Sequence, residues 1–296
     1  MVVIAVDIGG TKIKGAIVDE KGNIIHSKKV FLHQNETKSS LISNILYVIK
    51  FLSSIYKVPI KAIGISTSGT IDKSGKLIIT GNNLSSLKNV NLQKIIHQKT
   101  KVKVIVENDA NCFTLAESIY GKSNKRSSVL GIIWGTGIGS GLVINKQLIK
   151  GANNAFGEIG KIKVPINLDS QNKHYHHLEH LCGGKYIEKM YLHDKKDYIL
   201  PSKILSLKDS RAKKISNIVV TSLAWIIGTM ITTLNPEVIV LGGGVSNVSK
   251  DVYLKLKKEI KKYCPESLFK DLKLEKFSLS DDAGLLGAAY LANNLK

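Results

Sequence analysis

Several short segments of the sequence combine glycine with hydroxyl, carboxylate or amide side chains directly after an apolar run. The first is Asp7-Ile8-Gly9-Gly10-Thr11-Lys12. Glycines at such a point let backbone amides face a concave loop that can hold a phosphate group. Thr11 would add a hydroxyl donor, Lys12 a cation and Asp7 a carboxylate able to hold Mg²⁺ or its water shell. The residues alone fit such a phosphate loop and an ordinary hairpin turn with a polar tip equally well.

A second glycine loop, Gly135-Thr136-Gly137-Ile138-Gly139-Ser140-Gly141, stands about 125 residues later. Gly-x-Gly patterns are common in turns, so this loop alone is a weak signal. Two such loops at the tips of two hairpins suit two jaws that close on one polyphosphate. A dinucleotide-binding fingerprint does not fit, because a strand rather than a helix follows Gly10.

The segment Glu107-Asn108-Asp109-Ala110-Asn111 follows a third apolar run and opens a predicted helix. A carboxylate between two amides at this point can accept a proton from a bound hydroxyl group. Asn108 and Asp109 are also typical helix N-cap residues. Both interpretations stay open, since they can apply to different residues of the segment.

The elements that must position these segments follow an α/β pattern. Apolar runs predict strands at residues 2–6, 13–18, 24–31, 60–65, 102–106, 128–134 and 238–241, and a hairpin within 142–149. Helical spacing predicts helices at 36–56, 109–120, 217–235, 250–263 and 283–293. The pattern thus begins twice, each time with a strand hairpin whose turn is rich in glycine. We expect a smaller domain of residues 1–117 plus 281–296 and a larger one of 118–280.

Composition limits the classes of function. The formal net charge is +20, from 43 Lys+Arg and 23 Asp+Glu, but Arg126 and Arg211 are the only arginines. Readout of bases and clamping of phosphates favour arginine, so we expect a solvated lysine surface and no nucleic-acid partner. Three cysteines, Cys112, Cys182 and Cys264, do not make a disulfide framework. A reducing compartment, the cytoplasm, fits them.

Residues 217–235 form a stretch apolar enough to suggest a membrane span. The stretch is short for a span, contains five Ser/Thr and Gly228, and runs directly into a strand-like segment. We therefore expect a buried core helix and no membrane partner. The N-terminal MVVIAVDIGG lacks the basic start of a signal peptide.

Four segments together resemble the ROK family of sugar kinases within the actin/hexokinase/Hsp70 superfamily. They are, in order, DIGGTKIKGAIVD, VENDANCFTLAE, WGTGIGSGLVINKQLIKGANNAFGEIGKI and PEVIVLGGGVS, and the likeness runs from Ala5 to Ala292. The resemblance implies an α/β, two-domain actin-like ATPase (ribonuclease H-like) fold with an active-site cleft between the domains. It implies phosphorylation of a hexose or N-acetylhexosamine at its terminal hydroxymethyl group, with ATP and Mg²⁺ as cofactors. ROK glucokinases and N-acetylmannosamine kinases are the members it resembles, and glucokinase-like activity is the first expectation.

The resemblance also implies roles for single residues of this chain. Asp109 would be the general base. The residues that would bind the sugar are Asn83, Asn108, Asp109, Glu158, Lys161 and Glu179. The residues that would surround the nucleotide are Asp7, Gly9, Gly10, Thr11, Lys12, Thr136, Gly137, Gly243 and Gly244, the last two near the adenosine. Sugar hydroxyls both donate and accept hydrogen bonds, which suits carboxylate and amide partners.

The sequence departs from the family pattern where zinc-containing members hold their metal. Those members carry a histidine after the GEIG glycine and a cysteine cluster before the sugar-binding glutamate. This chain has Lys161 at the first position and His174-Tyr175-His176-His177-Leu178 before Glu179. Lysine cannot replace a zinc ligand, so we expect no metal there. His174, His176, His177, His180 and Cys182 form an improvised alternative site. We expect Lys161 to pair with Glu158, three residues before it, and to orient that carboxylate.

Two other functions stay open at this point. A sugar-sensing ROK regulator without catalysis is one, although the retained Asp109 counts against it. A polyphosphate-dependent sugar kinase is the other, because a charge of +20 attracts polyanions. The sequence does not name the sugar. We expect a homodimer whose other partners are the sugar and ATP.

Overall fold

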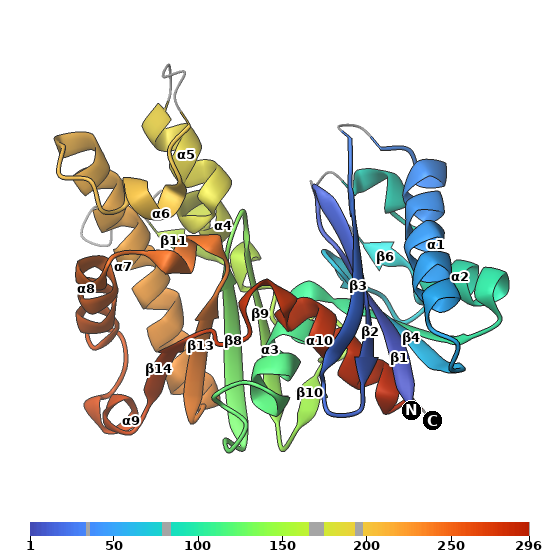
Figure 1. Cartoon of the computed structure of the whole chain (residues 1–296). Helices are drawn as coiled ribbons and strands as arrows, with labels where there is room; N and C mark the ends of the chain where they lie inside the picture. The colour runs from blue at the N-terminus through green and yellow to red at the C-terminus, as the bar shows by residue number, and fades with distance from the viewer. Residues whose placement is uncertain (34–35, 79–83, 166–174, 193–197, 296) are drawn as a thin grey trace. The chain divides into compact units, whose positions relative to one another are not determined.

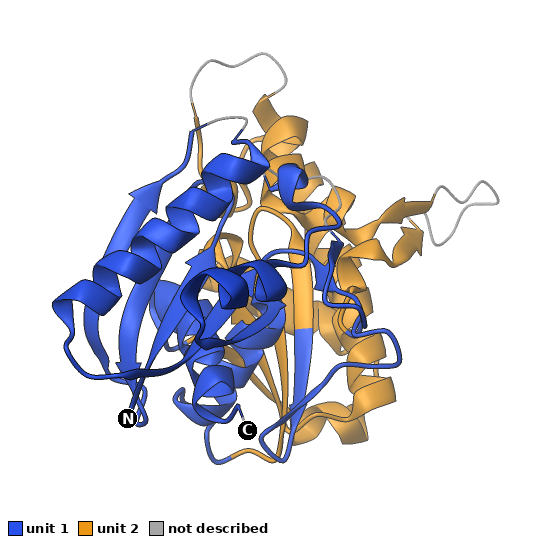
Figure 2. Cartoon of the chain, turned by 90° about the vertical axis from the view of Figure 1, so that its right-hand side faces the viewer, with its two compact units in different colours: residues 1–125, 141–156, 278–296 blue, residues 126–140, 157–277 orange. Residues whose placement is uncertain are grey.

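The computed structural model describes residues 1–33, 36–78, 84–165, 175–192 and 198–295. The chain forms two compact units, coloured separately in Figure 2. Unit 1 comprises residues 1–125, 141–156 and 278–296, and unit 2 comprises residues 126–140 and 157–277. The expected division assigned residues 141–156 to the second domain. They belong to unit 1 because Lys146 and Lys150 bond to the first unit's helix α3 and to the strand before it.

Unit 1 is built on a five-stranded sheet with the order β3-β2-β1-β4-β7. Its strands are β1 (Val2–Ile8), β2 (Lys12–Asp19), β3 (Ile24–Phe31), β4 (Ile60–Thr67) and β7 (Lys103–Asn108). Strands β1, β2 and β3 form an antiparallel meander, while β1, β4 and β7 run parallel. A two-stranded ladder, β5 (Thr70–Ile71) with β6 (Leu77–Ile78), follows β4.

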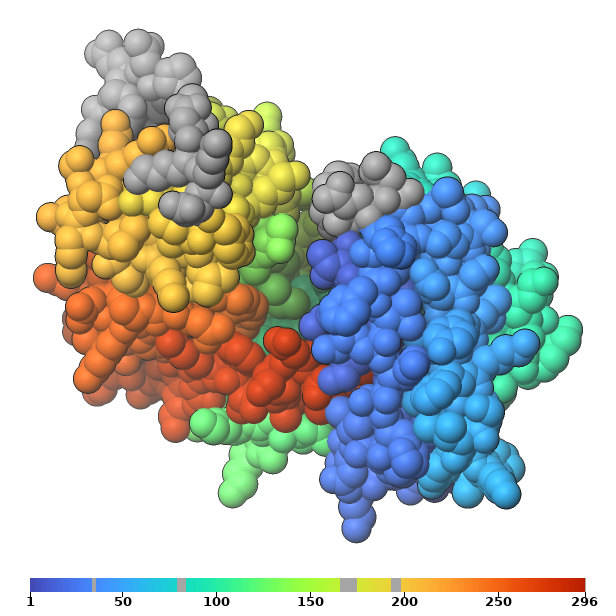
Figure 3. Space-filling model, turned by 45° about the horizontal axis from the view of Figure 1, so that its top comes forward, coloured from blue at the N-terminus to red at the C-terminus, as the bar shows by residue number. Residues whose placement is uncertain are grey.

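Helices cover both faces of this sheet. Residues of β1 alternate between the faces, as the period of two requires. Ile4 and Val6 join the core under α1 (Lys38–Ile55), and α10 (Ala283–Asn293) contacts β1 and β4 (Figure 1). The other helices of the unit are α2 (Leu92–Thr100), α3 (Asp109–Ile119) and two 3₁₀ turns, η1 (Ser85–Leu87) and η4 (Ser280–Asp282). The outer face of α1, mid-blue in Figure 3, lies at the surface.

The second sheet has the order β10-β9-β8-β13-β14. Its strands are β8 (Ser128–Trp134), β9 (Ile138–Ile144), β10 (Gln147–Ile149), β13 (Val238–Gly242) and β14 (Lys273–Lys276). Strands β8, β13 and β14 are parallel, and β9 and β10 form the expected hairpin through Asn145-Lys146. Both turn residues have positive φ, the geometry of a type I′ turn. The division between the units passes through β9.

The apolar stretch of the second half forms the core helix α7 (Ser210–Leu234) of unit 2. By length and composition alone α7 could cross a membrane, yet 61% of its most apolar window is buried inside the protein. It contacts α4 and α8, which supports the expected core helix. The remaining elements of the unit are η2 (Ile159–Lys161), β11 (Lys163–Pro165), β12 (Tyr175–His177), α4 (Leu178–Cys182), α5 (Gly184–Leu192), α6 (Pro201–Ile204), η3 (Gly244–Asn247), α8 (Lys250–Ile260) and α9 (Glu266–Lys270).

Candidate active site

Three parallel strands of unit 1 end side by side, and each ends in polar residues. The register aligns Asp7 of β1 with Ser66 of β4, and Ser66 with Glu107 of β7. The next row aligns Ile8, Thr67 and Asn108. The Gly9–Gly10 loop and Asp109 come directly after these rows. The structure therefore brings the predicted phosphate loop and the predicted base to one edge of one sheet.

The Asp7 carboxylate is held beneath the glycine loop. Its Oδ1 accepts a 2.6 Å hydrogen bond from Ser66 Oγ. Burial raises the pKa of Asp7, while the Ser66 hydrogen bond and the nearby Lys12 and Lys14 lower it. A divalent cation bound here would favour the ionised carboxylate. Mg²⁺ takes oxygen ligands, commonly one or two carboxylates together with phosphates, so Asp7 fits the expected metal.

The loop itself is a tight turn between β1 and β2. Gly9 N donates to Lys12 O at 3.0 Å, and Gly10 and Thr11 at its tip are exposed. Lys12 lies 3.7 Å from Asp281, a largely exposed carboxylate. An exposed pair of this kind contributes little energy, so the Lys12 ammonium stays available to an anion.

The turn at residues 107–111 shows which residue caps the helix. Asn108 is the N-cap of α3, because its Oδ1 accepts from the backbone N of Ala110 and of Asn111 at 2.9 and 3.1 Å. Asn108 Nδ2 in turn donates to Gly69 O at 3.1 Å. Asp109 is the first helical residue, and its Oδ1 accepts from Ala110 N at 2.8 Å. Asn108 is therefore the capping residue of α3, and the predicted base role of Asp109 stays a prediction.

Carboxylates gather around a buried thiol at the start of α3. Burial raises the pKa of the Cys112 thiol well above its usual range, and the charges of Glu107, Asp7 and Asp109 raise it further. Cys112 therefore stays protonated and unreactive. The three cysteines, all within the described residues, are free thiols.

Unit 2 repeats the pattern of a glycine turn at the end of a strand. Gly135 O accepts from Gly184 N at 2.8 Å, and Thr136 O accepts from Lys185 N at 3.2 Å. These bonds tie the β8–β9 turn to the start of α5. Gly137 passes close to Glu179, since a Cβ on Gly137 would lie 2.4 Å from Glu179 Oε2. Two predicted residues, one for phosphate and one for sugar, are thus neighbours.

The glycines after β13 differ in what requires them. Gly243 has φ +83°, and a Cβ there would lie 2.5 Å from Trp134 O, so the fold itself demands this glycine. A Cβ on Gly244 would meet no atom of the described residues within 4 Å. Space beside Gly244 is open to a ligand, as expected for an adenosine neighbour.

Glu158 stands on a loop that packs against β9. Gly157, before it, has φ +90°, and a Cβ there would lie 2.0 Å from Ser140 O. Gly157 O also accepts hydrogen bonds from Ser140 N and Ser140 Oγ at 3.1 and 3.0 Å. Glu158 itself is exposed and occupies the N-cap position of the 3₁₀ turn η2, with no capping hydrogen bond from its side chain. The backbone at Glu158 is therefore fixed by its neighbours.

The ion pair that the structure shows for Lys161 joins it to Glu179, where the sequence predicted Glu158. Lys161 Nζ lies 3.1 Å from Glu179 Oε1, and Glu179 Oε2 accepts from Ile138 N at 3.4 Å. The two side chains are 41% and 24% exposed. The pairing arises because the β11–β12 ladder aligns Lys163 with His177 and so brings η2 beside α4.

Of the predicted ligands, the described histidines His176, His177 and His180 do not gather with Cys182 into the improvised metal site. Cys182 is turned into the core, where Sγ donates to Val219 O at 3.4 Å. His177 Nδ1 bonds to Lys161 O at 2.7 Å, and the His180 ring packs on Tyr186. Within the described residues no group of three or more His, Cys, Asp or Glu could hold a metal ion. His174 and Asn83 lie outside them.

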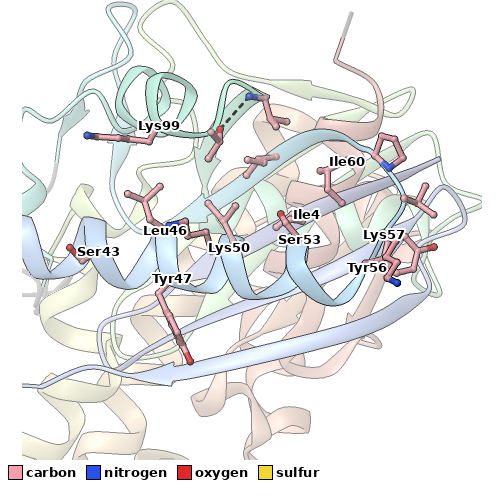
Figure 4. Close-up of a pocket in the computed structure, with 16 residues that line it drawn as sticks. Ile4, Ser43, Leu46, Tyr47, Lys50, Ser53, Tyr56, Lys57, Ile60 and Lys99 are labelled. Carbon is pink, nitrogen blue, oxygen red and sulfur yellow. Dashed lines mark hydrogen bonds between the residues drawn. The ribbon is translucent and has the colours of Figure 1, made fainter.

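A separate cavity of about 860 Å³ lies in unit 1 between α1 and the end of α2 (Figure 4). Ile4 and Ile63 form part of its floor, and Lys50, Lys57 and Lys99 belong to its wall. Of the described residues that line it, none is a carboxylate. Its strand residues lie before the carboxyl ends that carry Asp7 and Asn108, so it is distinct from the candidate active site.

Sequence comparison identifies the family. A model of the ROK family matches residues 3–295, almost the entire chain. The chain belongs to the ROK family. An N-acetyl-D-glucosamine kinase of Yersinia pseudotuberculosis is 29% identical over 302 residues, which cover 96% of this chain and 97% of the relative.

Solved ROK structures show the same fold. A glucokinase from Streptomyces griseus, in complex with glucose and AMPPNP, has a TM-score of 0.80 at 24% identity and is covered completely, as is this chain. A ROK family transcriptional regulator, a homologue of the E. coli MLC protein, has a TM-score of 0.81 at 21% identity. The alignment covers 99% of this ROK chain and 78% of the regulator. The two-domain actin-like fold expected from the sequence is confirmed. Because kinases and regulators share this fold, the fold does not decide the activity, which must be argued from the residues of the candidate site.

Sequence reasoning missed the residues that support the predicted ones. Ser66, which directly follows the predicted strand 60–65, holds Asp7. Glu107 was noted beside Asp109, yet its partner Lys150 was not found. Thr67 Oγ1, fully buried at the same strand ends, has no hydrogen-bond partner within the described residues. A polar run at the end of a buried strand was the available signal for Ser66 and Thr67.

Proposed function

We propose that this ROK family member is an ATP-dependent sugar kinase that phosphorylates the terminal hydroxymethyl group of a hexose or N-acetylhexosamine. The observation that carries the proposal is the strand-end row of unit 1. It places Asp7, the Gly9–Gly10 loop and the Asn108–Asp109 turn at one edge of one sheet. A metal-binding carboxylate, a phosphate loop and a base are the parts that phosphoryl transfer to a hydroxyl requires.

In the proposed reaction Asp109 accepts the proton of the sugar hydroxyl as its oxygen bonds to the γ-phosphorus of ATP. The bond from that phosphorus to the β–γ bridging oxygen breaks, and ADP leaves. The Gly9–Gly10 turn, closed by the bond from Gly9 N to Lys12 O, would present the Thr11 hydroxyl and the Lys12 ammonium to the transferred phosphoryl group. When bound, Mg²⁺ neutralises charge on the phosphates, and Asp7 is the residue that would hold it or its water shell. A positioned base contributes roughly 10²–10⁴-fold.

The family resemblance also assigns residues of unit 2 to the two substrates. Glu158 and Glu179, together with Lys161, would accept and donate hydrogen bonds to the sugar hydroxyls, while Thr136 and Gly137 would lie along the phosphates. Asn108 would bind a hydroxyl through its amide. Asn83, also expected to bind the sugar, lies outside the described residues.

Glucose is the sugar we propose first, with N-acetylhexosamines next. The similar Streptomyces griseus protein is a glucokinase, and the Yersinia relative is an N-acetyl-D-glucosamine kinase. The two sugars differ at carbon 2, where glucose has a hydroxyl group and the other an acetamido group. As a kinase with free thiols, the protein would act in the cytoplasm, and we propose that it does so as a homodimer.

A panel of sugars tests this proposal. Purified protein is given ATP, Mg²⁺ and one sugar at a time, and ADP release is coupled to a visible reaction. We expect turnover with glucose or an N-acetylhexosamine and none with a 6-deoxy analogue, which lacks the reacting hydroxyl. If the protein bound one of the sugars but phosphorylated none of them, it would be a regulator instead.

The phosphoryl donor needs a competition arm in the same assay. Phosphorylated sugar is measured with ATP alone, with polyphosphate alone and with both. We expect ATP to support turnover and polyphosphate to add little. A higher kcat/KM with polyphosphate would assign the charge of +20 to donor binding.

A further inference from the structure

Glu107, two residues before the proposed base, is a buried carboxylate with every oxygen occupied. Its side chain is 6% exposed, and Oε2 lies 2.6 Å from Lys150 Nζ. Oε1 accepts from Asn108 N at 2.9 Å and from Asn111 Nδ2 at 3.0 Å. Glu107 is therefore hydrogen-bonded to residues on both sides of Asp109 in the chain, Asn108 before it and Asn111 after it.

A buried carboxylate keeps its charge only where a partner offsets the lost hydration. Among the described residues the cation that does this for Glu107 is Lys150. Without the lysine, the Glu107 carboxylate would be left buried with no cation beside it, which favours its turning toward water. That movement would break the hydrogen bonds that Glu107 Oε1 accepts from Asn108 N and Asn111 Nδ2.

Lys150 follows strand β10 in a hairpin that binds α3 at both ends. Lys146, in the turn of that hairpin, bonds to the backbone oxygen of Ser118, in the last turn of α3, and to that of Asn124, beyond the helix. Lys150 bonds to Glu107 ahead of the first turn. The two lysines lie on the same hairpin and each bonds near one end of α3 through its ammonium group. Of the two, Lys150 is the one that contacts the turn with Asp109.

We propose that Lys150 is a positioning residue for Asp109, acting through Glu107. The inference rests on the proposed kinase function, in which Asp109 must meet the sugar hydroxyl at hydrogen-bond distance. Displacement of a reacting group by about 1 Å costs on the order of 100-fold in rate. The ion pair fixes the backbone on which Asp109 stands, so its loss lowers kcat without altering the phosphate loop.

The first arm of the test compares steady-state kinetics of Lys150→Met with Lys146→Met as the matched control. We expect Lys150→Met to lower kcat roughly 10- to 100-fold and to change the KM for ATP less than about twofold. Lys150→Arg retains the ion pair and should keep kcat within about threefold. Lys146→Met should keep kcat near the wild-type value even if its melting temperature falls as far as that of Lys150→Met.

A double variant separates charge pairing from simple loss of contact. Glu107→Gln leaves an amide oxygen for Asn108 N and needs no cation. We therefore expect Glu107→Gln/Lys150→Met to recover at least about fivefold in kcat over Lys150→Met alone, which is non-additive coupling. Additive losses across the pair, or equal kcat for Lys150→Met and wild type, would overturn the proposal.

Hydrogen exchange keeps the inference testable apart from the activity. The amides of Ala110 and Asn111 donate to Asn108 in the native turn. Lys150→Met should speed their exchange at least about tenfold, whereas Lys146→Met should not. If the wild-type protein phosphorylates no sugar, the proposed function fails and this arm alone decides the positioning role. Unchanged exchange in Lys150→Met would then overturn it.

Discussion

Replacing Lys161 by alanine tests how Glu179, the carboxylate that we propose binds the sugar, is held. Lys161 Nζ lies 3.1 Å from Glu179 Oε1, with the side chains 41% and 24% exposed. Water screens a pair this exposed, so its direct stabilisation is about 0.2–1 kcal/mol. We expect the melting temperature to fall by less than about 3 °C.

The effect on sugar binding should be larger than the effect on stability. Without Lys161, the 3.4 Å bond from Ile138 N is the other contact that orients Glu179. A charge-assisted hydrogen bond is worth about 1.5–3 kcal/mol, and loss of roughly half of one corresponds to a KM about 3- to 12-fold higher. We therefore expect Lys161→Ala to raise the KM for sugar by this factor and to leave the KM for ATP nearly unchanged.

The assay is the coupled ADP-release measurement with sugar and ATP varied in turn. Lys163→Ala is the matched control, because Lys163 is an exposed neighbour on β11 whose backbone alone takes part in the ladder. Lys161→Arg should restore most of the sugar affinity. Equal sugar KM values for Lys161→Ala and wild type, or equal rises for both substrates, would refute the orienting role.

Three further predictions concern the nucleotide side and the metal. Burial raises the pKa of Asp7, so ionising this carboxylate destabilises the folded protein. The protein keeps its full stability below the pKa that Asp7 has in the unfolded chain, and it loses stability as the pH rises through the pKa that Asp7 has in the folded protein. Without ligands, Asp7→Asn should therefore have a higher melting temperature than wild type at pH 7, and the difference should vanish near pH 4. Thermal scans at both pH values measure it, and an equal difference at pH 7 and pH 4 would contradict this prediction. Gly244→Ala should raise the KM for ATP and leave the melting temperature unchanged. Gly243→Ala, at φ +83°, should instead lower the free energy of unfolding by about 2–4 kcal/mol. Equal free energies of unfolding for the two variants in chemical denaturation would contradict these different roles of the two glycines. Elemental analysis should find no stoichiometric zinc, and one equivalent lost together with activity on chelation would contradict that.

The strand-end residues were predictable from the sequence because local rules decide them. Apolar runs of strand length that stop at polar residues mark the carboxyl ends of buried strands. Asp7 and Asn108 lie at such stops, and parallel pairing then sets them side by side whatever the details of packing. Asn145 and Lys146 between two short apolar runs predicted the β9–β10 turn for the same reason.

The partners of the charged residues were not predictable, because they lie far away along the chain. Helical spacing pointed from Lys161 to Glu158, three residues before it, but the ladder that brings Glu179 close spans a separate pair of short strands. Lys150 and Glu107 likewise meet only after the β9–β10 hairpin packs on α3. One lysine among so many carries no signal of its partner.

The role of Asp109 is the central claim, and the Asp109→Asn variant tests it most directly. Asparagine keeps the size and polarity of the side chain but cannot take the proton of the sugar hydroxyl. The account predicts that kcat falls roughly 10²–10⁴-fold, while calorimetry gives a sugar affinity within about threefold of wild type. A variant that keeps more than about a tenth of the wild-type kcat would contradict the assignment of Asp109 as the general base.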